Sequence, residues 1–311
     1  MAIMTRVATR ALGGAPAVLL GLAGAGHAQL QNGFYKGKCG ANDVEAVVQG
    51  IVRSRFARDA PIVAYLLRMQ FHECAVNGCD GGLLIDGPGT EKTASPNLST
   101  ASPNLSVKGY DLIADIKAEL ERRCPGVVSC SDIQILATRD AVALAGGRPY
   151  AVRTGRRDRR QSRASDVSRA SDVVLPAPDS TAAQSVAFFR KLGLSEFDAV
   201  LLLGAHTVGA THCGVIKDSR LYKYGGRAGA TDPALDPYYA FVYKTWRRRG
   251  VLPCDQNLYG DGASTKWIVN LLANNSDLFP SLFPQALIKL GEVNVITGAQ
   301  GEIRKVCSKF N

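Results

Sequence analysis

The sequence predicts an all-α domain, and three observations support this fold class. Apolar residues recur with helical spacing in long segments, and residues that favour helix starts precede these segments. Strand-like segments are few and short, for example Tyr150 to Arg153. A chain of 311 residues can bury the core of one large domain or of two fused lobes.

Residues 1–28 are expected to be a signal peptide rather than part of the fold. Arg6 and Arg10 give the segment a basic start, and an apolar run of small residues, 11–26, follows. A membrane anchor is the alternative, but the run is short for a span and no second hydrophobic stretch follows. We therefore expect a secreted chain, extracellular, in the cell wall or vacuolar, with no membrane span and a mature domain of residues 29–311.

The helices are placed by their caps and apolar faces. Asn42 can cap the first helix, whose apolar face comprises Val44, Val47, Val48, Ile51 and Val52. Pro61 suits the first turn of the second helix, which runs toward Glu73. Later helices are expected to begin near Tyr110, Ser131, Thr181, Ser195 and Ser264, and the last to end at Leu290-Gly291.

Two short duplications interrupt this pattern. TASPNLS at 93–99 is repeated at 100–106, and SRASDV at 162–167 is repeated at 168–173. Neither repeat is long enough to form a structural unit of a solenoid. We interpret both as loop insertions, which cost little entropy.

Charge and cysteine content bear on the partners and the compartment. The formal net charge is +10 at pH 7. In a secreted protein this favours attraction to acidic cell-wall polysaccharide over nucleic-acid binding, and we expect a monomer. Eight cysteines fit an oxidising compartment, although spacing alone cannot assign their pairing. The close pair Cys74 and Cys79 lacks a second short-spaced Cys or His pair, so disulfides are favoured over a zinc site.

Histidines are the candidate catalytic groups, since the mature chain has only His72, His206 and His212. Arg68 and His72 are four residues apart, so a helix turns them to the same face. His206 ends a strongly apolar helix, where a neutral imidazole can bind haem iron. The alternative for Arg68 and His72 is a structural ion pair, and the alternative for His206 is a buried core histidine.

Several motifs, taken in order, resemble those of the class III plant haem peroxidases. They are LLRMQFHECAVNGCD at 66–80, EKTASPN at 91–97, CPGVVSC at 124–130, TGRRD at 154–158, LPAP at 175–178, GAHTVG at 204–209, DQ at 255–256 and GEIRKVC at 301–307. The resemblance implies two all-α lobes enclosing haem b. It also implies an enzyme that reduces hydrogen peroxide and then oxidises phenolic donors in one-electron steps.

The resemblance assigns roles to single residues. His206 would ligate the haem iron, and Asp255 would accept the other N–H of that ring. His72 would move the peroxide proton, with Arg68 stabilising the charge that builds as the O–O bond breaks. Asn97 would hold the tautomer of His72, but the first duplication makes Asn104 an equally good candidate. Phe71 would pack against haem, and Pro176 would offer its carbonyl to aromatic donors.

The resemblance also implies disulfides and calcium sites. The implied pairs are Cys39–Cys124, Cys74–Cys79 and Cys130–Cys307. The implied distal calcium ligands are Glu73, Asp80 and the carbonyls of Val76 and Gly78, because oxygen-rich loops suit this hard cation. Thr207 would begin a proximal calcium site, and Asn97 and Asn274 begin sequons for glycosylation.

The chain departs from the family pattern at two places. Glutamate stands at position 73 and glycine at position 82, where the family usually has aspartate and serine. After Trp246 the chain runs directly into the family's later segment, which indicates an internal deletion near 246–247. The deletion would leave the proximal calcium site incomplete and remove the usual partner of Cys213, so that only the out-of-pattern Cys254 remains.

Two alternative functions are weighed against the peroxidase. One is an impaired or haem-free isoform that acts as a secreted, wall-associated binding protein. The other is a zinc hydrolase, which is disfavoured because His72-Glu73 lacks the second histidine of a His-Glu-x-x-His helix.

Overall fold

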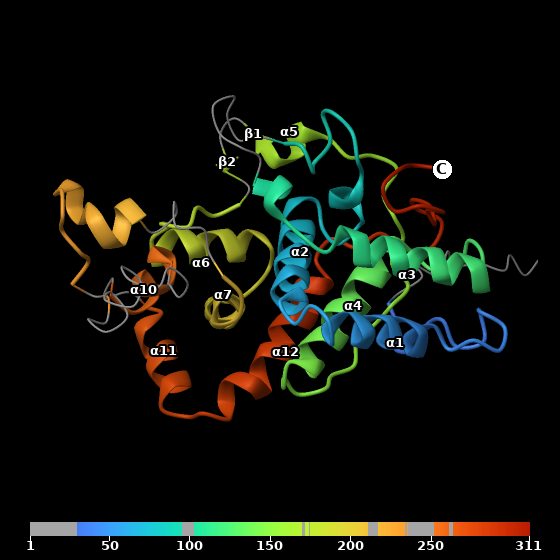
Figure 1. Cartoon of the computed structure of the whole chain (residues 1–311), viewed down its shortest axis with the longest axis horizontal. Coiled ribbons are helices and arrows are strands. Elements are labelled where there is room, and N and C mark those ends of the chain that lie inside the picture. The colour runs from blue at the N-terminus through green and yellow to red at the C-terminus, as the bar shows by residue number, and fades with distance from the viewer. Residues whose placement is uncertain are drawn as a thin grey trace, which may run out of the picture.

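The computed structural model describes residues 30–94, 103–169, 172–173, 175–210, 217–233, 235, 252–260 and 264–311. Within these ranges the chain is mainly helical (Figure 1). Its α-helices are α1 (Val44–Phe56), α2 (Ile62–Val76), α3 (Tyr110–Arg123), α4 (Cys130–Leu144), α5 (Ala164–Val167), α6 (Ala182–Lys191), α7 (Glu196–Leu203), α10 (Pro253–Gly260), α11 (Lys266–Ala273) and α12 (Leu278–Gly291). The expected signal peptide, 1–28, lies outside the described residues.

Short helical turns occur in the loops. Four are 3-10 turns, namely η1 (Gly82–Leu84), η2 (Pro103–Ser106), η3 (Gly204–Thr207) and η5 (Tyr224–Gly226), and η4 (Lys217–Tyr222) is a π turn. No helix in the described part of the chain is both long and apolar enough to cross a membrane.

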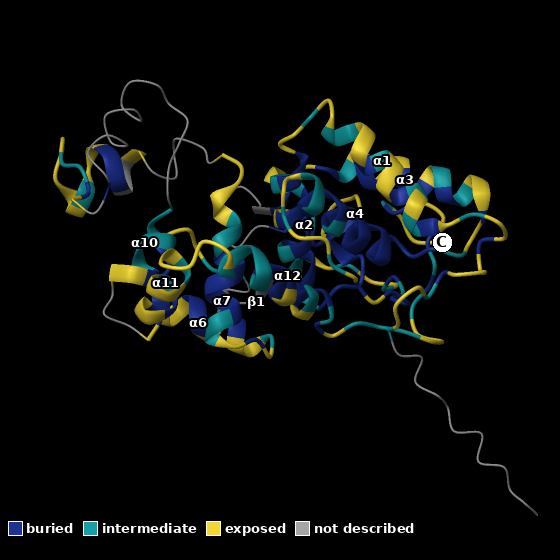
Figure 2. Cartoon of the chain, turned by 90° about the horizontal axis from the view of Figure 1, so that it is seen from below, coloured by how far each residue is buried: buried dark blue, intermediate teal, exposed yellow. Residues whose placement is uncertain are grey.

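The helices form two groups, so the expected all-α, two-lobed fold is confirmed. In one group α1, α2, α3 and α4 contact one another, and in the other α6, α7, α10 and α11 do so (Figure 1). Helix α12 contacts both α2 and α7 and so joins the groups. The buried residues concentrate where α2, α4 and α12 meet, and α4 is buried along most of its length (Figure 2).

The caps explain where the helices start. Thr181 and Ser195 form capping boxes with Gln184 and Asp198 at the starts of α6 and α7, as their residue types predict. The expected cap of α1 was wrong by one residue. Asp43, not Asn42, accepts the hydrogen bond of the Ala46 N–H at 3.1 Å.

The predicted strand at Tyr150 to Arg153 was also wrong. Those residues are irregular, and two isolated bridges follow them, one between Gln31 and Thr154 and one between Asp158 and Glu302. A two-residue antiparallel pair, β1 (Ser168–Arg169) with β2 (Asp172–Val173), instead lies within the second copy of the SRASDV repeat. A short extended segment therefore does not form a strand without a partner segment beside it.

The three disulfides implied by the resemblance are present. They join Cys39 to Cys124, Cys74 to Cys79, and Cys130 to Cys307. The last bond joins the C-terminal segment to the start of α4. Cys254 is a buried free thiol, and Cys213 lies outside the described residues.

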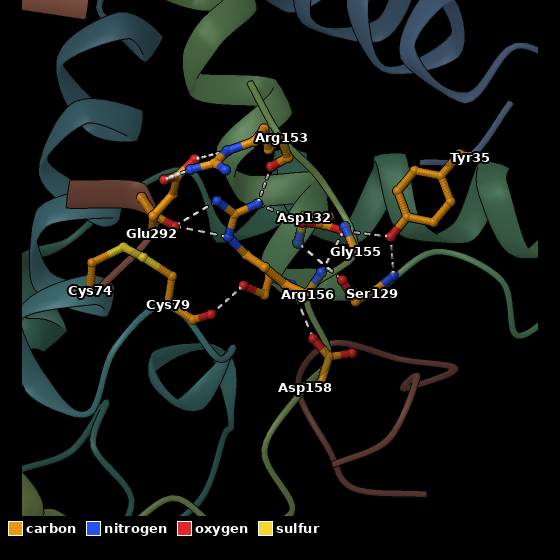
Figure 3. Close-up of polar contacts among 12 residues, drawn as sticks. Tyr35, Cys74, Cys79, Ser129, Asp132, Arg153, Gly155, Arg156, Asp158 and Glu292 are labelled. Atoms are coloured by element: carbon orange, nitrogen blue, oxygen red, sulfur yellow. Dashed lines mark hydrogen bonds and ion pairs between the residues drawn. A yellow bond between two sulfur atoms is a disulfide. The ribbon is translucent and has the colours of Figure 1, made fainter. Parts of the chain in front are cut away.

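A buried polar network beneath α4 holds the loop that follows residue 150 (Figure 3). The Asp132 carboxylate accepts hydrogen bonds from the Tyr35 hydroxyl at 2.7 Å, from the Gly155 N–H at 2.7 Å and from Nη1 of Arg156 at 2.8 Å. Arg156 also donates to the carbonyl of Gly291 at 2.9 Å. Because all of these groups are buried, each depends on its partners for the hydrogen bonds that water would otherwise supply.

Candidate active site

Helix α2 places Arg68 and His72 one turn apart on the same face. The guanidinium Nε of Arg68 lies 3.2 Å from Nε2 of His72. Nη1 of Arg68 donates to the Ser106 carbonyl at 3.0 Å and Nη2 to the Ser106 hydroxyl at 2.8 Å. Both groups are basic, so their contact is a hydrogen bond rather than an ion pair.

The hydrogen bonds around His72 determine its tautomer. Its Nδ1 lies 2.7 Å from the side-chain oxygen of Asn104, which can only accept, so Nδ1 carries the proton. Nε2 then faces the Arg68 donor as an unprotonated nitrogen. Burial, together with the positive charge of Arg68, lowers the pKa of His72 to about 4. His72 is therefore a neutral ring at neutral pH, and the lone pair of its Nε2 accepts the hydrogen bond of the Arg68 Nε–H.

Asn104 replaces Asn97 as the partner of His72. The Asn104 amide nitrogen donates to the Glu91 carbonyl at 2.7 Å, and this bond turns the amide oxygen toward the ring. Asn104 is fully buried, whereas Asn97 lies outside the described residues. The second copy of the TASPNLS repeat thus supplies the asparagine that contacts His72.

The expected calcium loop follows α2. Glu73 is buried, and its Oε1 accepts hydrogen bonds from the N–H groups of Asp80 at 2.9 Å and Gly82 at 3.1 Å. Its Oε2 accepts another from Leu83 at 3.0 Å. Val76 ends α2, and Gly78 follows with a φ of +105°, which favours glycine. The Glu73 carboxylate therefore organises the loop through its backbone amides.

Glu91 fills the space beside Gly82. A Cβ on Gly82 would lie 2.6 Å from Oε1 of Glu91, so a serine there would collide with this carboxylate. Asn77 joins the cluster by donating to Glu91 at 3.2 Å and to Asp166 at 3.1 Å. Compared with the serine that the family usually has, Gly82 lacks one hydroxyl oxygen, while the Glu91 carboxylate brings two oxygens close to the same position.

Burial dominates the electrostatics of this loop. It raises the pKa of Glu73 and of Asp80, and it raises that of Glu91 to about 9 with help from the two neighbouring carboxylates. Asp80 pairs with Arg159. A bound cation would offset the cost of these buried charges. However, in the described ranges these oxygens do not converge on a single point.

The proximal residues lie where α7 ends. His206 is in η3, and its Nδ1 is 2.7 Å from Oδ1 of Asp255 at the start of α10. Lys289 of α12 anchors α7 through Asp198 at 2.7 Å. Beyond η3, a Cβ on Gly209 would lie 2.8 Å from Cβ of Ala64 in α2. The segment that carries His206 therefore passes close to the helix that carries His72.

The remaining expected residues have clear positions. Phe71 is half-buried, with its ring 5.8 Å from that of Phe188 and 5.9 Å from that of Phe189 in α6. Thr207 is exposed, and its hydroxyl donates to the Gly204 carbonyl at 2.8 Å. Pro176 is half-buried in the loop before α6.

Sequence reasoning assigned no role to Glu91 or Ser106. Both lie in or beside the repeated TASPNLS segment. The sequence motif was therefore recognised, but the contacts of these two residues were not predicted. Neither contact follows from sequence spacing, because both depend on how this loop folds back onto α2.

The family of the chain follows from comparison with known proteins. A peroxidase family model matches residues 48–275, which is more than half of the chain. Peroxidase 57 of Arabidopsis thaliana is 43% identical over 91% of this chain and 93% of its own length. Peroxidase 28 of the same plant is 41% identical over 91% and 94%, and Peroxidase 5 of Vitis vinifera is 38% identical over 91% and 92%. The chain therefore belongs to the peroxidase family, as a class III plant haem peroxidase that uses hydrogen peroxide.

Proposed function

We propose that His206 would hold the iron of haem b and that His72 and Arg68 would activate hydrogen peroxide. The observation that carries this proposal is the pair of oriented imidazoles. In each ring Nδ1 contacts a side-chain oxygen, Asn104 for His72 and Asp255 for His206, which leaves Nε2 for chemistry. The two rings lie on neighbouring segments, α2 and η3.

The donor set fits haem. A neutral histidine whose second nitrogen donates to a carboxylate is a common iron ligand, and the carboxylate makes it more basic. The His206 side chain is 42% exposed, and its contact with Asp255 uses Nδ1 rather than Nε2. Bound haem supplies the redox centre at which peroxide is reduced by two electrons.

The residues of the chain manage the proton and the charge. Nε2 of His72 accepts a proton from hydrogen peroxide and returns it to the departing oxygen. The guanidinium of Arg68, held by Ser106, stabilises the negative charge that develops during O–O cleavage. Phenolic donors then supply single electrons, with the Pro176 carbonyl as a docking point.

Further properties belong to this proposal. We propose a distal calcium ion at Glu73 and Asp80 with the carbonyls of Val76 and Gly78, and an incomplete proximal site at Thr207. We also propose that the chain is secreted, and that its charge of +10 attracts it to acidic wall polysaccharide.

We propose an internal deletion near 246–247. The alignment with Peroxidase 57 extends over 310 positions while covering 91% of this chain, which supports a segment missing here. The deletion would remove the usual disulfide partner of Cys213, and losing a native disulfide typically costs about 2–5 kcal/mol of folding stability. The alternative to full activity is therefore an isoform that retains haem poorly.

The test is to load the purified chain with haemin and record the Soret band and phenol oxidation. We expect a Soret band typical of histidine-ligated haem that is lost in His206→Ala, together with turnover in the wild type. A normal band without turnover would favour the non-catalytic binding protein. Well-folded protein with no band would refute the haem proposal.

The two copies of the repeat allow a matched comparison. We expect Asn104→Val to slow the reaction with peroxide about 10–100-fold, because the residue that orients a functional histidine is lost. Asn97→Val should leave the rate unchanged. Stopped-flow measurement of the second-order rate constant checks this, and equal effects of the two substitutions would overturn the assignment of Asn104.

The pH dependence follows from the low pKa of His72. Only the neutral ring can accept the peroxide proton, and burial and Arg68 keep it neutral down to about pH 4. The rate should therefore be flat at neutral pH and fall as the pH drops through about 4. Stopped-flow pH-jump mixing limits acid exposure. An inflection near 6.5, the ordinary histidine value, would contradict this environment.

A further inference from the structure

Three metal-ligating side chains converge where η3 meets the start of α10. His206, Cys254 and Asp255 each offer one ligand atom, and these atoms all lie within 4.8 Å of one another. No other group of three or more such residues converges in this way in the described part of the chain. Cys254 has no role in the proposed peroxidase chemistry.

The distances suit a tetrahedral ion. Zinc–ligand bonds are about 2.0–2.3 Å long, so neighbouring ligand atoms in a tetrahedron lie about 3.3–3.8 Å apart. Sγ of Cys254 is 3.8 Å from Oδ1 of Asp255. Nδ1 of His206 is 2.7 Å from the same oxygen, a hydrogen-bond distance. A bound ion would take the place of the proton between Nδ1 of His206 and Oδ1 of Asp255. These two atoms would then need to move apart by well under about 1 Å.

The scaffold holds two of the ligands. Cys254 and Asp255 lie in the first turn of α10, and the Cys254 N–H donates to the Pro178 carbonyl at 2.9 Å. The Cys254 side chain is buried, whereas that of His206 is 42% exposed. The site is therefore closed on the thiol side and open on the imidazole side, where water can complete a fourth position.

The donor chemistry selects the ion. A thiolate, an imidazole and a carboxylate together favour borderline-soft ions such as Zn²⁺ over calcium or magnesium, which take oxygen ligands. Arg220 donates to the carbonyl of Leu252, close to the cluster in sequence, at 3.5 Å and pairs with Asp232 at 2.8 Å. Its charge is thus compensated by that carboxylate.

We propose that the haem-free chain binds one Zn²⁺ ion through His206, Cys254 and Asp255, with water at the open position. Binding converts the thiol to a metal-bound thiolate and releases its proton to solvent, while the proton on Nδ1 of His206 moves to Nε2 of the same ring so that Nδ1 can bind the ion. The bound ion also takes the Asp255 oxygen that otherwise orients His206. The inference goes beyond the proposed function, because it concerns the chain before haem is bound.

Cobalt reports on such a site. The haem-free full chain, carrying Cys213→Ser so that Cys254 cannot pair with that cysteine, is titrated with Co²⁺. We expect a thiolate-to-cobalt charge-transfer band and strong visible absorption typical of tetrahedral Co²⁺, both displaced by stoichiometric Zn²⁺. Cys254→Ser should abolish the charge-transfer band, and His206→Ala or Asp255→Asn should weaken affinity at least about 100-fold, more than loss of an outer-shell partner does.

His72→Ala is the matched control, because this histidine is not one of the three converging residues, and its substitution should leave cobalt binding unchanged. Absence of the band, or a band that survives Cys254→Ser, would overturn the proposal. Haemin uptake is measured separately on the same preparation. A chain that takes up haemin but gives no cobalt band refutes the metal site alone, whereas a chain that binds cobalt but no haemin refutes the haem proposal alone.

Discussion

Replacing His72 with alanine is expected to slow the reaction with hydrogen peroxide about 10²–10⁴-fold, the usual contribution of a positioned general base. The lone pair of Nε2 is lost, while Arg68 keeps its contacts with Ser106. The measurement is the second-order rate constant for peroxide, followed at the Soret band by stopped flow.

Two controls separate catalysis from folding. The Soret band of His72→Ala should match the wild type, since His206 lies on a different segment. Added imidazole should restore part of the rate, because the truncated ring leaves space between Asn104 and Arg68. Unchanged turnover in His72→Ala would refute the distal role of this residue.

Replacing Asp132 with alanine is expected to lower the free energy of unfolding by about 3–5 kcal/mol, the usual effect of breaking a buried ion pair. Arg156 would keep a buried positive charge without its carboxylate, and the Tyr35 hydroxyl would lose its acceptor. Domains are stable by only about 5–15 kcal/mol, so this loss is a large fraction. Urea denaturation followed by circular dichroism measures it.

Asp115→Ala is the matched control. Asp115 also pairs with an arginine, Arg55 at 3.5 Å, but its side chain is 67% exposed. Exposed ion pairs contribute about 0–1 kcal/mol, so this variant should remain near the wild type. Similar losses in the two variants would show that the buried network of Figure 3 has no special importance.

The helices and the order of the motifs were predictable from the sequence. Helix starts depend on residues within one turn, as the capping boxes at Thr181 and Ser195 show. Arg68 and His72 share a face because a helix repeats nearly every four residues. The predicted strand at 150–153 does not form, because a strand, unlike a helix, needs a partner segment from elsewhere in the chain.

The site was only partly predictable, because its contacts join distant segments. Both copies of the repeat contain the same asparagine, so no local feature distinguishes Asn97 from Asn104. The position of Glu91 beside Gly82 depends on how the segment after α2 folds, which local residue preferences do not specify.

The sequence by itself determined the all-α class and the family and pointed to the two candidate histidines, since these depend on local periodicity and on motif order. Only the tertiary structure selected Asn104, which is 32 residues from His72, and brought Cys254 beside His206. The physical reason is that such contacts depend on how the intervening loops fold back, and the local conformational preferences of the residues do not specify those paths.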